Sequence, residues 1–379
     1  MIRLPAIKIQ QGLSSRPFLS AGSFLGTLAL ALAAAVPLIY LAGTDPVTAY
    51  GALLRGSVGD QYALSETVVQ ATPLLVGGLA VALAFHAGLF NIGVEGQLVV
   101  GGLAAAAVGV NLDLPAAVHL PVAVLTGAAA GAAWAAIPAV LKAWRGVHEV
   151  VTTIMFNYLA FGLSRHLVAP GGGLASATQP SASDPVADGA RLPALTETTR
   201  IHSGVLLAVA AVIAVGWFLY RTPAGFKLRM VGANPTTASF HGVGVRRVQI
   251  GALMGSGALA GLAGASEILG LYGRYLDSFS PGYGFQAIAI ALMGMLTPLG
   301  VLAAAAFFGM LAAGSVGLQS VGISRELINV VSGLVVGFVA AQPALIGAYL
   351  RRRRKRQASG QGEDASAAPA DVDARSAHV

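Results

Sequence analysis

The chain of 379 residues contains no cysteine and few charged or aromatic residues. The absence of cysteine excludes disulfide bonds and thiolate chemistry. Charged residues make up only 10% of the chain, against about 25% in soluble domains, and hydrophobic residues make up 55%. The sequence has no polar stretch long enough for a soluble catalytic domain, no phosphate-binding loop of the Gly-x-x-x-x-Gly-Lys-Ser/Thr type and no set of acids and histidines with metal-ligand spacing. These absences argue against a soluble or metal-dependent enzyme.

Long apolar stretches recur along the chain, and about 20 apolar residues suffice for a helix to cross a bilayer core. We therefore predict an all-α polytopic membrane protein with about ten transmembrane helices. The first stretch follows basic residues as a signal peptide would, but its length favours a helix that is retained. The short stretch at 283–296 is predicted to be either a full crossing or a half-helix. The predicted spans lie near 19–41, 65–86, 92–110, 117–141, 149–169, 203–220, 247–270, 283–296, 299–319 and 327–349.

Basic residues cluster in every second gap between these stretches, and such clusters mark the cytoplasmic side of a membrane protein. This pattern places both termini in the cytoplasm. It also accounts for the net charge of +7 by membrane anchoring, so no nucleic-acid partner is expected. The predicted organisation is a cytoplasmic segment 1–18, a transmembrane domain 19–350 with an outer loop 170–202 and a cytoplasmic loop 221–247, and a tail 351–379 that is basic and then disordered.

Two segments share a Gly-x-x-x-Gln spacing before a predicted helix, namely Gly93 to Gln97 and Gly282 to Gln286. In the predicted topology the first lies near the inner face and the second near the outer face. An inverted repeat would produce this arrangement. Chance recurrence in a glycine-rich chain explains the spacing equally well, so the repeat stays a hypothesis.

Polar residues interrupt the apolar stretches at a few places, and a charge within a membrane span usually faces a protein-lined or watery interior. Three acids, Glu95, Glu149 and Glu267, lie at or near span ends. The polar residues of the fifth span share one helical face, which would either hold helices together or line a path. Around Glu95, an interfacial turn satisfied by water and lipid headgroups is the alternative to a gate. The candidate path or gate residues are Asn91, Glu95, Gln97, Glu149, Thr153, Asn157 and Gln286.

The cytoplasmic loop 221–247 contains the signals of a short helix. Asn234 suits the capping position and Pro235 the first turn. Such a helix, lying parallel to the membrane, would offer a docking element to a cytoplasmic partner, although an ordinary basic loop explains the composition as well. We expect Ala238 and Gly242 to form a small-residue face, and Phe240 and His241 to project.

Several stretches together resemble a known family. They are His86-Ala-Gly-Leu-Phe-Asn-Ile-Gly-Val-Glu-Gly-Gln97, His148-Glu-Val-Val-Thr-Thr-Ile-Met-Phe-Asn-Tyr158, Gly232-Ala-Asn-Pro-Thr-Thr-Ala-Ser-Phe-His-Gly242, Gly257-Ala-Leu-Ala-Gly-Leu-Ala-Gly264 and Gly282-Tyr-Gly-Phe-Gln-Ala-Ile-Ala-Ile-Ala-Leu292, which runs on to Thr297-Pro-Leu-Gly300. In this order they resemble the permease family of ABC importers for branched-chain amino acids and simple sugars, and within it the nucleoside/simple-sugar branch.

The resemblance implies one subunit of a larger machine in a bacterial inner membrane. Its expected partners are an ABC ATPase subunit, a second homologous permease subunit and an extracellular solute-binding lipoprotein. The ATPase would bind ATP, so this chain is expected to have no catalytic residues, metal or cofactor of its own. The sequence leaves the substrate open. The resemblance assigns contact with the ATPase to Gly232, Ala233, Asn234, Pro235, Ala238 and Gly242.

Two other classes of function stay open at this stage. A secondary transporter driven by an ion gradient would use Glu95, Glu149 and Glu267 as proton or sodium sites. A membrane scaffold without transport activity is the third hypothesis. The 232–242 stretch separates the first two classes, because a secondary carrier has no need of a helix that docks an ATPase.

Overall fold

The computed structural model describes residues 33–41 and 43–324, with single residues 26, 29, 330, 333, 334 and 337. The predictions for 1–18, for the tail 351–379 and for most of the first and last spans lie outside the described residues. Within them the chain is helical, with two isolated β-bridges in its loops. The helices are α3 (Pro46–Val58), α4 (Gln61–His86), α5 (Val94–Asn111), α6 (Ala116–Arg145), α7 (Glu149–Val168), η1 (Asp188–Ala190), α8 (Gly204–Arg221), α9 (Pro223–Ala233), α10 (Pro235–Phe240), α11 (Val245–Ser266), η2 (Glu267–Tyr272), α12 (Tyr283–Met293) and α13 (Pro298–Ser320).

Six helical segments are long and apolar enough to cross a membrane: α4, α5, α6, α8, α13 and the combined α11–η2 segment Val245–Tyr272. This confirms the all-helical polytopic class, while the count of ten crossings stays a prediction. The described helices agree with the eight predicted spans between residues 65 and 319 to within a few residues at most ends. Helix α3 was not predicted. It begins where Asp45 accepts a hydrogen bond from the Thr48 backbone N–H, followed by Pro46 in the first turn.

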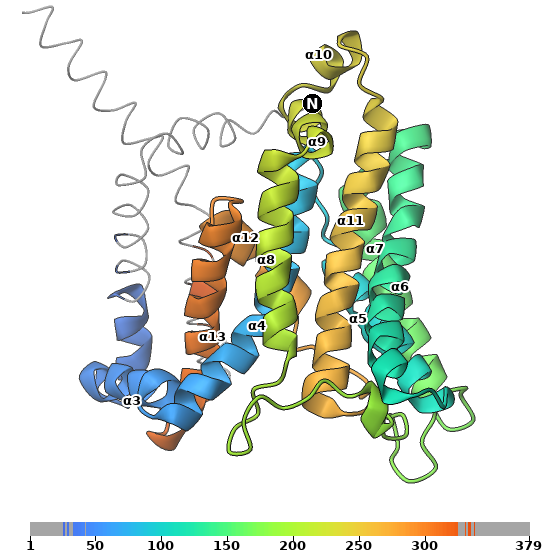
Figure 1. The fold of residues 1–379 in the computed structure, drawn as a ribbon. Helices are drawn as coiled ribbons and strands as arrows, with labels where there is room; N and C mark the ends of the chain where they lie inside the picture. Colours follow the sequence, from blue (N-terminus) through green and yellow to red (C-terminus); the bar gives the residue numbers. More distant parts are fainter. Residues whose placement is uncertain are drawn as a thin grey trace, which may run out of the picture.

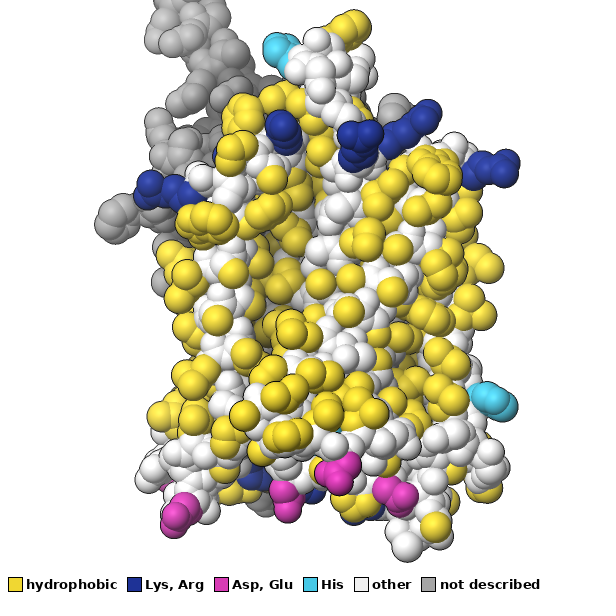
Figure 2. Space-filling model, turned by 45° about the vertical axis from the view of Figure 1, so that its right-hand side comes forward, with side chains coloured by type: hydrophobic (Ala, Val, Ile, Leu, Met, Phe, Trp, Pro, Cys, Tyr) yellow, Lys and Arg dark blue, Asp and Glu magenta, His cyan; other side chains and the backbone are white. Residues whose placement is uncertain are grey.

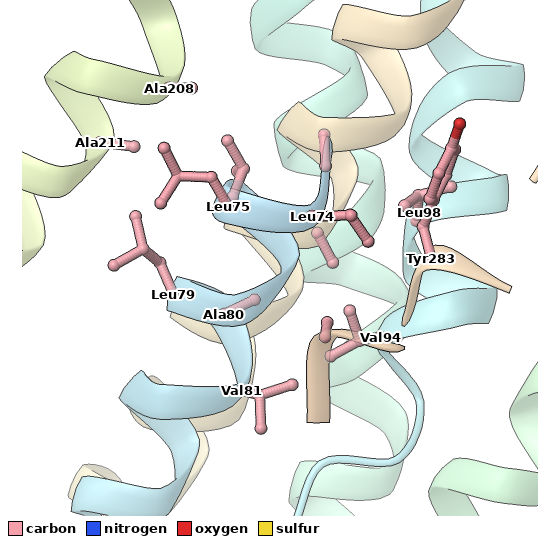
Figure 3. Close-up of a cluster of buried hydrophobic side chains, with 14 of the residues drawn as sticks. Leu74, Leu75, Leu79, Ala80, Val81, Val94, Leu98, Ala208, Ala211 and Tyr283 are labelled. Atoms are coloured by element: carbon pink, nitrogen blue, oxygen red, sulfur yellow. The ribbon is translucent and has the colours of Figure 1, made fainter. Parts of the chain in front are cut away.

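Helix α4 lies at the centre of the bundle, between α8 and α11 on one side and α12 and α13 on the other (Figure 1). Leu75 and Leu79 point toward Ala208 and Ala211 of α8, while Leu74 lies on the side of α5 and Tyr283 (Figure 3). Most of α4 is buried, and Glu66 is its only charged residue. Its apolar circumference is therefore explained by burial in protein on all sides rather than by contact with lipid.

Helices α5, α6 and α11 approach one another closely through glycine. A Cβ atom on Gly131 of α6 would lie 2.3 Å from the Gly257 carbonyl oxygen of α11 and 2.8 Å from the Gly261 Cα. Neither atom can move without shifting a helix backbone. Small residues at such crossings allow the backbone contact that drives helix association in lipid. This contact explains part of the high glycine content noted in the sequence.

The two ends of the bundle differ in charge. Lys and Arg side chains gather at the end that carries α9 and α10, which we call the basic end, and Asp and Glu lie at the opposite end (Figure 2). The opposite end carries the long loop 169–203, and we call it the loop end. A broad hydrophobic band separates the two ends (Figure 2). The basic residues of the helix ends that meet there are Lys142, Arg145, Arg221, Lys227, Arg229, Arg246 and Arg247.

Helix α12 is a half-helix. Its 11 residues span about 16 Å at 1.5 Å per residue, roughly half of a bilayer core of about 30 Å. The preceding segment 273–282 is not helical, and it leads from the loop end into the bundle. Helix α12 then continues toward the basic end (Figure 1). Of the predicted span 283–296, only residues 283–293 are helical, and the 273–282 segment before them consists mainly of turns and bends.

Candidate functional site

The first turns of α5 and α12 meet inside the bundle. The Gly284 backbone N–H donates to the Glu95 carboxylate, with 2.6 Å between the nitrogen and Oε2. A Cβ atom on Gly284 would lie 2.3 Å from the Glu95 backbone nitrogen, so glycine is required for this approach. The expectation that the two Gly-x-x-x-Gln segments lie at opposite faces is therefore wrong. Both chain segments that lead into these helices dip into the bundle, which places the two helix starts in contact.

A pocket of about 250 Å³ opens beside this contact. We call it the junction pocket. Helices α5 and α7, the 273–282 segment and α12 each contribute to it, so it lies where four parts of the chain converge. Its lining residues are Glu95, Val99, Phe161, Ser164, Arg165, Tyr275, Asp277, Ser278, Ser280, Gly282 and Phe285.

The polar side chains that line the junction pocket are linked by hydrogen bonds and an ion pair. The Ser164 hydroxyl lies 2.7 Å from the Tyr275 hydroxyl and donates to Asp277 Oδ1 at 3.1 Å. Arg165 Nε lies 3.8 Å from Asp277 Oδ2. Carboxylates accept hydrogen bonds from hydroxyl groups of a ligand, and the exposed ring of Phe285 offers a face for stacking. The chemistry of this wall suits binding of a small polar ligand. Among the described residues, no cluster of acids and histidines could hold a metal ion.

A second polar cluster lies near the start of α5, and its side chains hydrogen-bond to one another and to the backbone. The Asn91 side-chain amide donates to Gln97 Oε1 at 2.9 Å and to the Ser256 hydroxyl at 2.8 Å. Ser256 in turn donates to the Ala80 carbonyl of α4 at 2.6 Å. Asn91 also accepts from the Gly93 backbone N–H at 2.9 Å. We call these residues, Asn91, Gln97 and Ser256, the amide network. Its bonds satisfy irregular backbone at membrane depth by protein alone, as such backbone requires.

Asn157 on α7 fixes the start of α5. Its side-chain oxygen accepts from the Gly96 backbone N–H at 2.8 Å, and its nitrogen donates to the Ile92 carbonyl at 2.9 Å. Glu149, Thr153 and Asn157 share one face of α7, and all three side chains are buried. Thr153 donates to the Glu149 carbonyl at 2.8 Å.

Of the predicted path residues, Glu95 alone lines the junction pocket. Asn91 and Gln97 belong to the amide network, and Asn157 holds α5. The Glu149 carboxylate pairs with Lys142 at 2.6 Å at the basic end. Gln286 is half-buried on α12 outside the pocket lining.

The π-helix η2 at the end of α11 holds a third polar cluster. Both Glu267 carboxylate oxygens and the Ser266 hydroxyl are buried without a hydrogen-bond partner among the described residues. His202, in the loop before α8, accepts from the Gly204 backbone N–H at 3.2 Å through Nδ1, so its proton is on Nε2. Burial lowers the pKa of His202 to about 4. π-Helical turns are frequent at functional sites, but this turn does not reach the junction pocket.

The 232–242 stretch at the basic end has the predicted local structure. Asn234 accepts from the backbone N–H groups of Thr236 at 3.0 Å and Thr237 at 3.2 Å, which confirms its role as the cap of α10. Phe240 projects as predicted, with 85% of its surface exposed. Ala238 instead is fully buried, so the small-residue face predicted for it is turned toward the chain itself.

The other small residues of this segment have separate structural roles. A Cβ atom on Gly232 would lie 2.1 Å from the His86 carbonyl oxygen, so Gly232 packs α9 against the end of α4. Gly242 has a φ of +75°, a conformation that favours glycine. Ala233 and Pro235 are exposed. The accessible surface of the segment is therefore formed by residues 233–237 and 239–242, among which Phe240 is the large apolar side chain.

Sequence analysis missed most of the junction pocket. Ser164, Arg165, Tyr275 and Asp277 were not singled out, because each is ordinary in its local context. One signal was present: Asp277 is the last charge before the uncharged stretch 278–324, which begins with the Pro281 and Gly282 break ahead of α12. A charge beside a broken helix in a membrane domain marks a candidate binding site.

The fold and the junction pocket define a multi-pass membrane protein with a polar pocket at the start of a broken helix, which is a typical arrangement in transporters. Comparison with known proteins identifies the group. The family model described as "Branched-chain amino acid transport system / permease component" matches residues 63–340. The chain belongs to this family and is a membrane permease, a transport protein and not an enzyme.

Several curated relatives align over most of their length. The guanosine ABC transporter permease protein NupP of Bacillus subtilis is 39% identical over 83% of this chain and 92% of that protein. The glucose ABC transporter permease protein TsgB13 of Haloferax volcanii is 36% identical over 94% of this chain and 96% of that protein. The nucleoside ABC transporter permease protein NupB of Lactococcus lactis is 30% identical over 79% of this chain and 85% of that protein. No solved structure matches the chain.

Proposed function

We propose that the chain is the permease subunit of an ATP-driven importer for nucleosides or related simple sugars, and that the junction pocket lies on its translocation path. The observation that supports this best is the pocket wall, where Glu95 and the Ser164–Asp277 pair lie beside the exposed ring of Phe285. Carboxylates and a serine suit the hydroxyl groups of a sugar, and an aromatic face suits a base or sugar ring. The guanosine, nucleoside and glucose permeases among its relatives support the same substrate class.

The proposed partners are an ABC ATPase subunit, a second homologous permease subunit and an extracellular solute-binding lipoprotein. The ATPase binds ATP and docks on the α9–α10 segment, and its movements reach the bundle through α9. One contact and one exposed side chain support this route: Gly232 of α9 packs against the end of α4, and Phe240 of α10 is exposed beyond it. The lipoprotein delivers the substrate at the loop end. In this proposal the second permease completes the path beside the junction pocket.

The proposed topology has ten crossings in a bacterial inner membrane, with both termini in the cytoplasm and an inverted repeat that relates α5 to α12. The charge difference between the basic end and the loop end supports this orientation by the positive-inside rule (Figure 2). The proposed transmembrane domain is 19–350, followed by the basic and disordered tail. Because the chain has no cysteine, a single cysteine at Ser359 tests the orientation. Labelling of Ser359→Cys by an impermeant maleimide in intact cells would contradict it.

Co-purification from mild detergent tests the assignment of partners. The tagged chain, expressed with its genomic neighbours, is expected to retain an ATPase, and Phe240→Glu is expected to release it. Leu195→Glu is the control, because Leu195 is also an exposed apolar residue but lies at the loop end. Uptake that persists without any ATPase would instead support the carrier driven by an ion gradient, with Glu95, Glu149 and Glu267 as its candidate ion sites.

A further inference from the structure

An apolar groove of about 550 Å³ lies between α8 and α11, near the basic end. We call it the α8–α11 groove. Val215 and Phe218 of α8 form one wall, Gly251 and Gly255 of α11 form the other, and Leu83 of α4 forms the floor. Helix α9 lines the groove at the basic end, where it contributes Lys227. The groove is separate from the junction pocket, with which it shares no residue.

The groove is about as long as the apolar part of one bilayer leaflet is thick. Along α11 its lining runs from Val248 to Leu259, which is about 16 Å at 1.5 Å per residue. Half of a bilayer core of about 30 Å is about 15 Å. The volume of the groove falls within the range of about 300–1,000 Å³ that is typical of ligand sites. Its length and volume therefore suit an acyl chain of a lipid in the leaflet at the basic end.

The charge at the end of the groove has one sign. Lys227 is exposed, and so are Arg221, Arg246 and Arg247 on the neighbouring helix ends. No acidic residue occurs between Glu197 and Glu267, so no side chain of this part of the sequence neutralises these cations. A basic site next to apolar surface on the cytoplasmic side is the arrangement that binds anionic lipid headgroups. Zwitterionic lipids lack the net negative charge that this site attracts.

We propose that the α8–α11 groove binds one anionic phospholipid, with an acyl chain between α8 and α11 and its phosphate at Lys227. Because α8 and α9 both line the groove, the lipid packs against the α9 helix that precedes the α10 docking segment. A bound lipid then supports the position of α9 against the bundle. The inference does not depend on the identity of the transported substrate.

Native mass spectrometry of the full chain, released from nanodiscs of equal parts phosphatidylglycerol and phosphatidylethanolamine, tests the proposal. The wild type is expected to retain one phosphatidylglycerol. Gly251→Leu is expected to lose it, because a Cβ at Gly251 meets nothing within 4 Å and the added side chain fills the groove instead of unfolding the protein. Gly162→Leu on α7 is the matched control, since Gly162 is an exposed helical glycine with equally open surroundings.

The charge is tested separately. Lys227→Gln is expected to reduce the preference for phosphatidylglycerol about tenfold, which corresponds to about 1.4 kcal/mol. Arg145→Gln, at the same end but outside the groove, is expected to leave the preference unchanged. Retention of the lipid by Gly251→Leu would overturn the proposal. A photo-crosslinker at position 251 that captures a protein segment instead of lipid would overturn it as well.

Discussion

The junction pocket and the amide network are both polar, both lie inside the bundle and both adjoin the start of α5, yet they differ in how their polar groups are satisfied. In the amide network, Asn91, Gln97 and Ser256 bond to one another and to backbone. In the junction pocket, Ser164 and Asp277 bond to each other on a wall that faces open space. Polarity within a membrane domain thus does not identify a path residue by itself. An opening beside the polar group has to be shown as well.

The comparison assigns different roles to residues that the sequence placed in one group. The amide network and Asn157 hold the irregular segment before α5, so their loss should reduce stability. In the junction pocket, substitutions that keep the size of the side chain should reduce transport in a protein that still folds. Four predictions separate these outcomes, in order of decreasing expected effect.

Replacement of Asn157 by leucine is expected to have the largest effect on stability. The variant leaves the Gly96 N–H and the Ile92 carbonyl buried without partners, at a cost of about 1–3 kcal/mol for each group. Thermal unfolding in detergent and abundance in membranes measure the loss. Met155→Ala, at an exposed position on the same helix, should change neither. An Asn157→Leu protein of normal abundance and impaired uptake would show that Asn157 acts in transport, as the pocket residues do, and not in stability.

Gly284→Ala tests the contact that the two clusters share. Its Cβ would overlap the backbone of Glu95, which cannot move without shifting α5, and the expected destabilisation is about 1–3 kcal/mol. Gly162→Ala serves as the control, because its surroundings are open. A normal unfolding temperature for Gly284→Ala would show that the two helix starts are not in contact.

Glu95→Gln and Asp277→Asn are expected to reduce uptake about tenfold or more without loss of abundance, because a hydrogen bond from a ligand to a charged group contributes about 1.5–3 kcal/mol. The amide oxygen at position 95 can still accept from the Gly284 N–H, so the helix junction is kept. Uptake in proteoliposomes that contain the whole transporter is the measurement. Full uptake by both variants would remove the pocket from the path.

The His202 imidazole is expected to add a small pH-dependent term to stability. Its pKa is lowered by burial from 6.5 to about 4, so the unfolded chain takes up a proton between these values while the folded protein does not. Stability should therefore decrease as the pH falls through this interval, by about 1 kcal/mol between pH 7 and 5.5. His202→Asn removes the titrating group, while its side-chain oxygen can still accept from Gly204. The difference in unfolding temperature between the two proteins should shrink with decreasing pH, and the exposed His166→Asn serves as control.

Much of the fold could be predicted from local sequence. The described apolar helices and the cap at Asn234 follow from hydropathy, glycine and proline positions and capping chemistry, whereas the sequence left open whether 283–296 is a full crossing or a half-helix. The contacts of the site could not be predicted in this way, because they join distant residues: Glu95 and Gly284 are 189 positions apart, and Ser164 and Tyr275 are 111 apart. The burial of Ala238 is equally non-local, since it depends on how α10 folds back on the chain.

Substrate protection of a single cysteine tests the role of the junction pocket most directly. The chain has no cysteine of its own, so Ser278→Cys in the exposed pocket wall and Ser256→Cys in the amide network can be labelled without background. In the assembled transporter, a maleimide should label position 278 and leave position 256 unlabelled, and a transported nucleoside should slow the labelling at 278. Labelling at 278 that no transported nucleoside or sugar affects would contradict the assignment of the pocket to the translocation path.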